Sequence, residues 1–414
     1  MKRLFLMAVV ALTLVACGGG GTNSDSSPTT SNVADLLVDS GPDGAGVNRL
    51  FTSVTICKPG STTVCQTIDH VLVDTGSVGL RLLASAVPAN LQLSTARSGS
   101  GNVLLGCANF LDGSFAWGPL AMADVKLAGL TASNTPLQLV GHSDYDAFQS
   151  QCSSGEPIIT AGDLGANGIL GVGLNKQDCG SVCEVQSRRG ARNGKYFACA
   201  NSACTSVSGT TLASDKQLQQ IVWRFPTDNN GFAIQMDSVP LAGAATASGK
   251  MIFGLGTRAN NRFPNLTVLA TTTQGYLHGV LSSNGPYAGG SFSGTFLDTG
   301  SNGIYFDATG IDSCVAPNDP GFYCPPADLV FSVVLSSTGA GGPQASGAFT
   351  VGQAATLFQS NFAALPSLGG SLNASGLLDL GLPYFFGRTV VMGIQGMPAT
   401  GLGSSTVTGP FYAF

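Results

Sequence analysis

Leu72-Val73-Asp74-Thr75-Gly76-Ser77 has a second copy far along the chain, Phe296-Leu297-Asp298-Thr299-Gly300-Ser301. Aliphatic and aromatic residues before an acidic turn predict a buried strand that delivers its last residue into a loop. Each aspartate is therefore expected at the carboxyl end of a strand. Two carboxyl groups in the same local frame predict a pair that faces across a pseudo-twofold axis, and such a pair can perform acid–base chemistry.

The residues after each aspartate predict how its loop is built. Gly76 and Gly300 are expected to supply the positive φ that a tight turn needs. Ser77 and Ser301 can hydrogen-bond back to the turn or to the carboxylate, which lowers the cost of its charge. A single tetrapeptide of this kind would be an ordinary turn, whereas two copies favour a functional pair.

Several further segments, followed in order along the chain, resemble those of the pepsin-like aspartic proteases. Trp117-Gly118 lies where that family has the Tyr-Gly of its flap hairpin. The remaining segments resemble the hydrophobic-Gly segments behind the catalytic loops, the strands between the lobes and the aromatic pair before the second catalytic strand: residues 167–173, 232–236, 250–254, 276–277, 380–386 and 389–391.

The resemblance implies a mostly β, bilobal fold in which each lobe is a double-ψ β-barrel, with an interlobe sheet and an active-site cleft. The N-terminal lobe is expected at residues 33–245 and the C-terminal lobe at residues 246–414. The composition agrees, because 43% hydrophobic residues, only 10% charged residues and 57 glycines are typical of a turn-rich globular chain. The best helical stretch is residues 214–222, which begins with Ser214 and Asp215.

The resemblance also implies an aspartic endopeptidase that needs no cofactor and no metal. One of Asp74 and Asp298 would activate a water as general base, and the other would protonate the carbonyl oxygen of the peptide bond. The sequence does not decide which aspartate begins as the base. Thr75 and Thr299 would tie the two loops together beneath the pair. A protein or peptide substrate would bind as an extended strand under the flap, with Ile304 and Tyr305 as contacts by position.

Two residues depart from the family pattern. Trp117 replaces the flap tyrosine, keeping an aromatic body and an N–H donor but no phenol oxygen. A core aromatic in an ordinary hairpin is an equal interpretation of Trp117. Arg81 stands where the family often has a tryptophan after the first loop.

The amino terminus predicts export and lipid anchoring. Lys2-Arg3 followed by the apolar residues 4–15 is typical of a signal peptide, which we place at residues 1–16. Residues 14–17 resemble a bacterial lipobox, so Cys17 is expected to carry a diacylglyceryl anchor on a flexible tether over residues 17–32. The expected location is a bacterial membrane, with the outer membrane favoured and its periplasmic or surface face undecided. The alternative is a soluble secreted protein cut near Ala16.

Cysteine usage predicts disulfides. Of 11 cysteines, the ten besides Cys17 could form five bridges in an oxidising compartment. Three pairs are close enough to close short loops: Cys57/Cys65, Cys199/Cys204 and Cys314/Cys324. The pairing of Cys107, Cys152, Cys179 and Cys183 stays open. A zinc site from Cys179, Cys183, Cys199 and Cys204 is an alternative.

Other functional classes find less support. The chain has no Gly-x-Ser-x-Gly elbow, no His-Glu-x-x-His helix and no phosphate-binding loop. Of its three histidines, His70 precedes Asp74 on the predicted strand and is interpreted as structural. The net charge of −5 and the lack of a basic stripe argue against nucleic-acid binding, and a monomer is expected. A binding lipoprotein that holds peptides or glycans without hydrolysis, and a structural envelope lipoprotein, remain as alternatives.

One expectation concerns regulation. Many zymogens of the pepsin-like family carry a basic prosegment that pairs with the catalytic aspartates. Between Gly18 and Asn48 this chain has no lysine or arginine. We therefore expect no self-inhibiting basic propeptide.

Overall fold

The computed structural model describes residues 31–180, 195–200, 203–207, 212–285, 287, 289–315, 321–337 and 342–414. Residues 31–414 form one compact unit. The predicted signal peptide, Cys17 and nearly all of the predicted tether lie outside the described residues. Within the part of the chain that is described, every helix is too short or too polar to cross a lipid bilayer.

The protein is mostly β, as predicted, and its described strands form sheets of seventeen, seven and two strands. The largest sheet contains β1 (Val33–Val38), β2 (Leu50–Cys57), β3 (Cys65–Asp74), β4 (Val78–Leu83), β5 (Ser94–Thr95), β6 (Val103–Asn109), β7 (Ser114–Leu127), β8 (Leu130–Val140), β9 (Glu156–Pro157), β10 (Gly168–Val172), β11 (Tyr196–Ala200), β12 (Ala203–Ser206), β13 (Gly231–Met236), β14 (Ala247–Phe253), β15 (Val268–Ala270), β23 (Thr389–Gly393) and β26 (Phe411–Ala413). The second contains β16 (Leu277–Ser283), β17 (Gly290–Asp298), β18 (Ile304–Phe306), β19 (Leu329–Ser336), β20 (Gln344–Val351), β21 (Gly369–Gly370) and β22 (Leu377–Gly381). The third pairs β24 (Pro398–Ala399) with β25 (Val407–Thr408).

The described helices are short. The α-helices are α1 (Ala161–Leu164) and α3 (Ala354–Leu357). The 3-10 turns are Ala84–Ala86, Ala89–Leu91, Ser143–Gln151, Ser214–Lys216, Val222–Arg224, Ala259–Asn261, Phe358–Ser360 and Leu382–Tyr384. The helix predicted over residues 214–222 is therefore wrong, because only its two ends form 3-10 turns. Gln217 is extended between them, with ψ of 157°, and its side chain donates to the carbonyl of Gly180.

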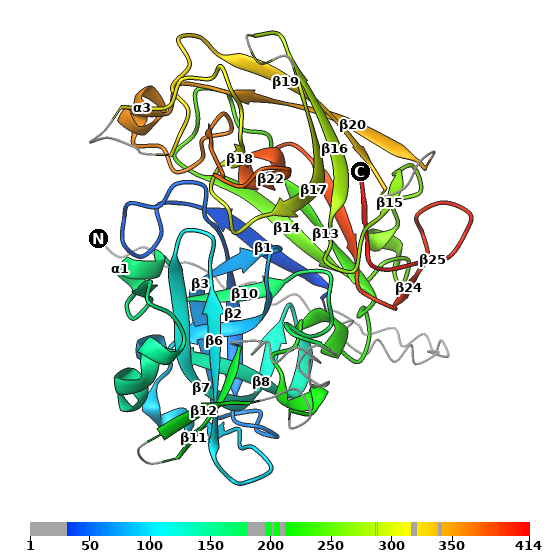
Figure 1. The fold of residues 1–414 in the computed structure, drawn as a ribbon. Coiled ribbons are helices and arrows are strands. Elements are labelled where there is room, and N and C mark those ends of the chain that lie inside the picture. Colours follow the sequence, from blue (N-terminus) through cyan, green and yellow to red (C-terminus); the bar gives the residue numbers. More distant parts are fainter. Residues whose placement is uncertain are drawn as a thin grey trace, which may run out of the picture. The chain divides into compact units, whose positions relative to one another are not determined.

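The two halves of the chain share one antiparallel stretch of sheet. β1, close to the start of the described chain, pairs with β14, which pairs with β13; β13 then pairs with β23, from the end of the chain (Figure 1). The predicted lobe boundary at residues 245/246 falls in the connection between β13 and β14. Because those two strands pair with each other, the boundary divides a shared sheet.

A repeated strand arrangement holds the two Asp-Thr-Gly-Ser loops. In the first half β3 runs parallel to β10, which is antiparallel to β4; in the second half β17 runs parallel to β22, which is antiparallel to β18. Asp74 lies opposite Gly171, and Asp298 lies opposite Gly381. The two aspartates thus occupy the same position in two copies of one arrangement, as the repeated sequence predicts.

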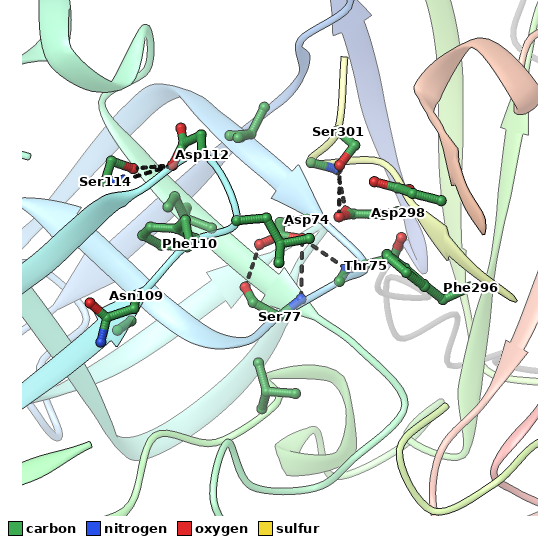
Figure 2. Close-up of a pocket in the computed structure, with 18 of the residues that line it drawn as sticks. Asp74, Thr75, Ser77, Asn109, Phe110, Asp112, Ser114, Phe296, Asp298 and Ser301 are labelled. Carbon is green, nitrogen blue, oxygen red and sulfur yellow. Dashed lines mark hydrogen bonds between the residues drawn. The ribbon is translucent and has the colours of Figure 1, made fainter. Parts of the chain in front are cut away.

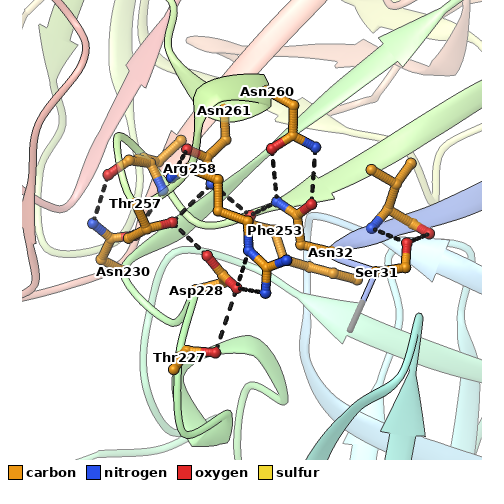
Figure 3. A network of polar contacts seen from close by, with 12 residues as sticks. Ser31, Asn32, Thr227, Asp228, Asn230, Phe253, Thr257, Arg258, Asn260 and Asn261 are labelled. Carbon is orange, nitrogen blue, oxygen red and sulfur yellow. Dashed lines mark hydrogen bonds and ion pairs between the residues drawn. The ribbon is translucent and has the colours of Figure 1, made fainter. Parts of the chain in front are cut away.

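A network of hydrogen bonds joins the start of β1 to the turn after β14 (Figure 3). The side chain of Asn32 donates to the carbonyl oxygen of Phe253 at 2.8 Å and accepts from the side chain of Asn260 at 2.8 Å. Nearby, the buried carboxylate of Asp228 pairs with Arg258 at 2.6 Å. These bonds satisfy polar groups that burial would otherwise leave unpaired.

Four disulfides are described, and they resolve part of the open pairing. Cys57–Cys65, Cys199–Cys204 and Cys314–Cys324 form as predicted. Cys107 pairs with Cys152 across 45 residues. Cys179 is also disulfide-bonded, and Cys183 lies outside the described residues. The zinc alternative is wrong, because the sulfurs of Cys199 and Cys204 are bonded to each other. Disulfides of this number indicate an oxidising, non-cytoplasmic compartment.

Candidate functional site

A cleft of about 950 Å³ contains both Asp-Thr-Gly-Ser loops. Asp74 enters it from the end of β3 and Asp298 from the end of β17, and Figure 2 shows the two side chains as neighbours. The tip of the hairpin formed by β6 and β7 also lines the cleft. The structure therefore brings together residues that are far apart in the sequence.

The carboxyl groups of Asp74 and Asp298 are close enough to share a hydrogen bond. Gly300 lies close to both groups, because a Cβ placed there would lie 2.8 Å from Oδ1 of Asp74 and 3.0 Å from Oδ1 of Asp298. Two neighbouring carboxylates repel each other, which raises the pKa of the pair's last proton. The pair is therefore expected to hold one shared proton at pH values at which isolated aspartic acids are ionised.

The predicted reason for Gly76 and Gly300 is wrong. Neither residue has a positive φ. Glycine is required instead because there is no space for a side chain: a Cβ on Gly76 would lie 2.6 Å from Cγ of Asp298. In the first loop a positive φ occurs instead at Gly79, three residues after Gly76, where φ is 100°.

Thr75 and Thr299 tie the two loops together, as expected. The Thr75 hydroxyl accepts the backbone N–H of Thr299 at 2.9 Å and donates to the carbonyl of Leu297 at 2.8 Å. The Thr299 hydroxyl accepts the N–H of Thr75 at 3.2 Å and donates to the carbonyl of Val73 at 2.6 Å. All four bonds are buried, so they fix the distance between the two aspartates.

The hydrogen bonds to the two carboxyl groups are nearly but not fully equivalent. Asp74 accepts the backbone N–H groups of Gly76 at 2.8 Å and Ser77 at 3.1 Å, and the Ser77 hydroxyl donates to its other oxygen. Asp298 accepts the N–H of Gly300 at 2.8 Å and the hydroxyl of Ser301 at 3.0 Å. Asp74 therefore has one more donor, and donors stabilise the charged form of a carboxyl group.

The pKa of Asp298 indicates the same difference between the two aspartates as the number of donors does. Burial raises the pKa of Asp298 to about 8, with further contributions from the charge of Asp74 and from the hydrogen bond between the two carboxyl groups. The N–H of Gly300 and the hydroxyl of Ser301 oppose this rise. The smaller number of donors and the raised pKa both favour Asp298 as the site of a shared proton.

The structure does not place the two predicted flap residues, Trp117 and Gly118, in the cleft. Trp117 is 3% exposed, contacts Phe197 with its ring and donates its N–H to the carbonyl of Tyr145 at 3.0 Å. A Cβ on Gly118 would lie 1.8 Å from the carbonyl oxygen of Leu139. Both residues belong to the core of the hairpin. The cleft is instead lined by residues at the tip: Asn109, Phe110, Leu111, Asp112 and Ser114 (Figure 2).

A sequence signal for this tip exists. Asp112-Gly113 lies between the two strands, and an Asp-Gly pair flanked by apolar strands is a strong hairpin signal. Gly113 has φ of 88°, and the carboxylate of Asp112 accepts the N–H of Ser114 at 2.9 Å. The aromatic residue at the tip is Phe110.

The structure places the other residues of interest from the sequence analysis at different sites, some lining the cleft and some outside it. Tyr305 lines the cleft and donates to Asn302, whereas Ile304 is fully buried and does not line it. Arg81 also borders the cleft, but its guanidinium is buried 3.6 Å from Asp178. His70 pairs with Asp39 at 3.2 Å outside the cleft, in agreement with its structural interpretation.

Sequence reasoning missed a third acid. Asp379 on β22 is 1% exposed and lines the cleft beside Asp298. Its signal was a charged residue inside the otherwise apolar strand Leu377-Leu378-Asp379-Leu380. A buried carboxyl group in an apolar strand is costly unless it is neutral or paired, and it therefore indicates a site.

No group of three or more side chains that could hold a metal ion occurs among the described residues. A family model described as "Protein of unknown function (DUF3443)" matches residues 28–414. The chain belongs to the DUF3443 family. The matched region includes both Asp-Thr-Gly-Ser loops, the β6–β7 hairpin and Asp379. A comparison with curated proteins found no match.

Proposed function

We propose that this protein is an aspartic endopeptidase that hydrolyses peptide bonds with Asp74 and Asp298. The observation that carries the proposal is the approach of these two carboxyl groups to hydrogen-bonding distance within a cleft. Paired carboxyl groups that share one proton provide an acid and a base at the same pH. The intact second copy of the loop favours hydrolysis over a binding protein on the same scaffold.

The repeated strand arrangement supports the proposed fold family. A strand that ends in the aspartate, a parallel strand behind it and an antiparallel third strand occur in both halves. The strands shared by the two halves fit an interlobe sheet. We therefore assign the protein to the pepsin-like architecture, with two double-ψ β-barrel lobes.

In the proposed mechanism Asp298 begins as the acid and Asp74 as the base. Asp298 holds the shared proton because burial and its neighbour raise its pKa, while Asp74 has the additional N–H donor from Ser77. The Asp74 carboxylate takes a proton from a water between the two groups, and that water attacks the carbonyl carbon. Asp298 gives its proton to the carbonyl oxygen as charge develops there. Asp74 then gives the proton it took from the water to the leaving nitrogen as the C–N bond breaks, and Asp298 regains a proton from the hydroxyl of the intermediate. Activity should fall as the pH rises through about 8, since Asp298 then loses its proton.

The substrate is proposed to be an unfolded protein or a peptide that binds as an extended strand. The cleft has the volume for several residues, and the hairpin tip with Phe110 and Leu111 lines the same cleft as Asp74. Leu111 is 73% exposed, so an apolar substrate side chain can cover it.

The location is proposed to be the exported side of a bacterial membrane, with Cys17 as the lipid attachment site. The disulfides support export. Loss of membrane association in Cys17→Ser, without loss of export, would support the anchor; an unchanged membrane fraction would contradict it.

The proposed activity can be tested with denatured casein as substrate. Wild-type protein should release peptides, a pepstatin-type inhibitor should block the release, and Asp74→Asn and Asp298→Asn should each abolish it. Asp215→Asn makes the same chemical change at an exposed residue outside the cleft and is the matched control. Casein that binds but is not cut by the wild-type protein would favour the binding lipoprotein instead.

A further inference from the structure

The two halves of the chain present corresponding residues to the cleft, and these residues differ in chemistry. Asp379 on β22 and Ile169 on β10 each lie two residues before the glycine that is opposite an aspartate of the pair. Both line the cleft. The first half thus has an apolar side chain at this position, whereas the second half has a carboxyl group.

The neighbours of Asp379 in the sheet are aromatic. Asp379 lies between Phe296 on β17 and Tyr305 on β18. Residues paired in this way project to the same face of a sheet, and all three line the cleft. The side chain of Asp379 is only 1% exposed. A substrate can therefore reach its carboxyl group only with the end of a long side chain.

The carboxyl group of Asp379 is not fully paired within the protein. Its Oδ1 is buried and has no hydrogen-bond partner among the described residues. Buried polar atoms are nearly always paired, and an unpaired one is costly. An unpaired oxygen on a residue that lines a cleft indicates that a bound ligand supplies the missing donor.

The charges around the cleft favour a cation as that donor. Of the described residues after residue 245 that line the cleft, Asp298 and Asp379 carry charged groups, and none is a lysine or arginine. In the first half Arg81 takes the place that Tyr305 has beside Asp379, but its guanidinium lies 3.6 Å from Asp178. The second half of the cleft therefore has acids and no counter-ion of its own.

The lack of a counter-ion agrees with the electrostatics of Asp379. Its pKa is raised well above the ordinary value, first by burial and then by the charge of Asp298. A cation placed beside the carboxyl group would lower this pKa and stabilise the charged form. The free site is thus one in which a bound cation would gain a strong partner.

We propose that Asp379 is a specificity-determining residue that binds the charged group of a substrate lysine or arginine next to the cleaved bond. This inference rests on the proposed endopeptidase function and narrows its substrates to chains with a basic residue at that position. The hydrocarbon part of the side chain packs against Phe296 and Tyr305, and its charged end donates to Oδ1 of Asp379. Because Ile169 occupies the corresponding place in the first half, the basic residue is expected on one side of the cleaved bond only.

Sequencing the products of a casein digest tests the preference directly. Wild-type protein should cut denatured casein at bonds where lysine or arginine is enriched at one of the two flanking positions. In Asp379→Leu this enrichment should be absent, with apolar residues in its place. Basic residues that are equally frequent beside cleaved and uncleaved bonds of the wild-type digest would overturn the proposal.

Two synthetic peptides measure the size of the preference. They share an apolar sequence and differ at one central residue, which is either lysine or norleucine, a side chain with the same four carbons and no ammonium group. For wild-type protein, kcat/KM should be about tenfold or more higher for the lysine peptide, the effect of one charge-assisted hydrogen bond. In Asp379→Asn, which keeps the shape and removes the charge, the ratio should fall to about one. Because both peptides are measured on one preparation, the ratio does not depend on the fraction of protein that is folded.

Asp112→Asn is the matched control for this experiment. It makes the same chemical change at an exposed residue that lines the same cleft from the hairpin tip. This variant should keep the wild-type ratio. A ratio that falls equally in Asp112→Asn and Asp379→Asn would assign the preference to the overall negative charge of the cleft, and an unchanged ratio in Asp379→Asn would exclude its carboxylate. Either result overturns the proposal.

Peptide binding separates this inference from the endopeptidase function. Measured by fluorescence anisotropy, Asp74→Asn should bind the lysine peptide about tenfold more tightly than the norleucine peptide, and the further change Asp379→Asn should remove the difference. If wild-type protein cleaves neither casein nor the peptides but this difference depends on Asp379, the endopeptidase function fails while the site for a basic side chain is supported. Cleavage without preference, together with equal binding of the two peptides, overturns this inference alone.

Discussion

The hydroxyl groups of Thr75 and Thr299 exchange hydrogen bonds across the centre of the site: each accepts the backbone N–H of the other residue and donates to a carbonyl of the strand that leads to the other residue. Because these bonds join the ends of β3 and β17, they determine how far apart Asp74 and Asp298 lie. The acid pair is therefore a property of two loops that support each other, and its chemistry depends on buried polar groups that are fully paired.

Removing one of these hydroxyls should weaken both the fold and the reaction. Thr75→Val leaves the N–H of Thr299 and the carbonyl of Leu297 without partners, so the free energy of unfolding should fall by about 2 kcal/mol or more. Urea unfolding measures this loss. Thr75→Ser keeps the hydroxyl and is the matched control. If valine and serine variants are equally stable, the interlock does not contribute as described.

Adding a methyl group at Gly76 should damage activity more than folding. A Cβ there would contact Cγ of Asp298 at 2.6 Å and displace the carboxyl group, and a displacement of about 1 Å can cost on the order of 100-fold in rate. Gly76→Ala adds no backbone strain, because its φ is not positive. Gly99→Ala, where a Cβ meets nothing within 4 Å, is the control. A fully active Gly76→Ala would contradict the close approach of the two aspartates.

The two aromatic residues of the β6–β7 hairpin should have separate effects. Trp117→Ala removes a buried ring and should lower the free energy of unfolding by about 3–5 kcal/mol. Phe110→Ala, at the tip, should leave stability nearly unchanged and raise KM for casein. Chemical unfolding and steady-state kinetics on both variants separate the two roles. A raised KM in Trp117→Ala together with a loss of stability in Phe110→Ala would contradict this assignment and identify Trp117 as the flap residue.

Stability should decrease as the pH rises towards 8. The folded state keeps the proton of Asp298 up to about pH 8, whereas the unfolded chain loses it near the ordinary value of about 4. The folded state therefore binds more protons in this window, and the free energy of unfolding falls with rising pH. Asp298→Asn should make this dependence shallower, leaving the part due to Asp379, whose pKa burial also raises. Urea titrations at about pH 5 and about pH 7.5 measure it, and an equal slope in the variant would assign the effect to another group.

Much of the site could be predicted from the sequence because the information was local and repeated. The two Asp-Thr-Gly-Ser loops predicted the strand ends and the pairing, and the resemblance to the pepsin-like family implied the threonine contacts. Trp117 could not be placed in the same way, since an aromatic residue in a strand has the same pattern whether it faces a cleft or a core. The role of Gly76 also depends on Asp298, a residue of the other half, which no local turn rule includes.

Tertiary contacts overrode two further local patterns. Residues 214–222 have helix-forming side chains, but Gln217 and Gln220 are fully buried by contacts with the segment before residue 181. Asp379 lies one residue outside the segment that resembled the family, residues 380–386, and inside an otherwise apolar strand. Its place in the cleft is visible only when β22 lies beside β17.

The central claim is tested most directly by a crystal structure of the protein with a statine-containing, pepstatin-type inhibitor. The account predicts that the inhibitor lies extended in the cleft with its central hydroxyl within hydrogen-bonding distance of both Asp74 and Asp298. An inhibitor hydroxyl that contacts neither aspartate, or carboxyl groups too far apart to hold it jointly, would contradict the account.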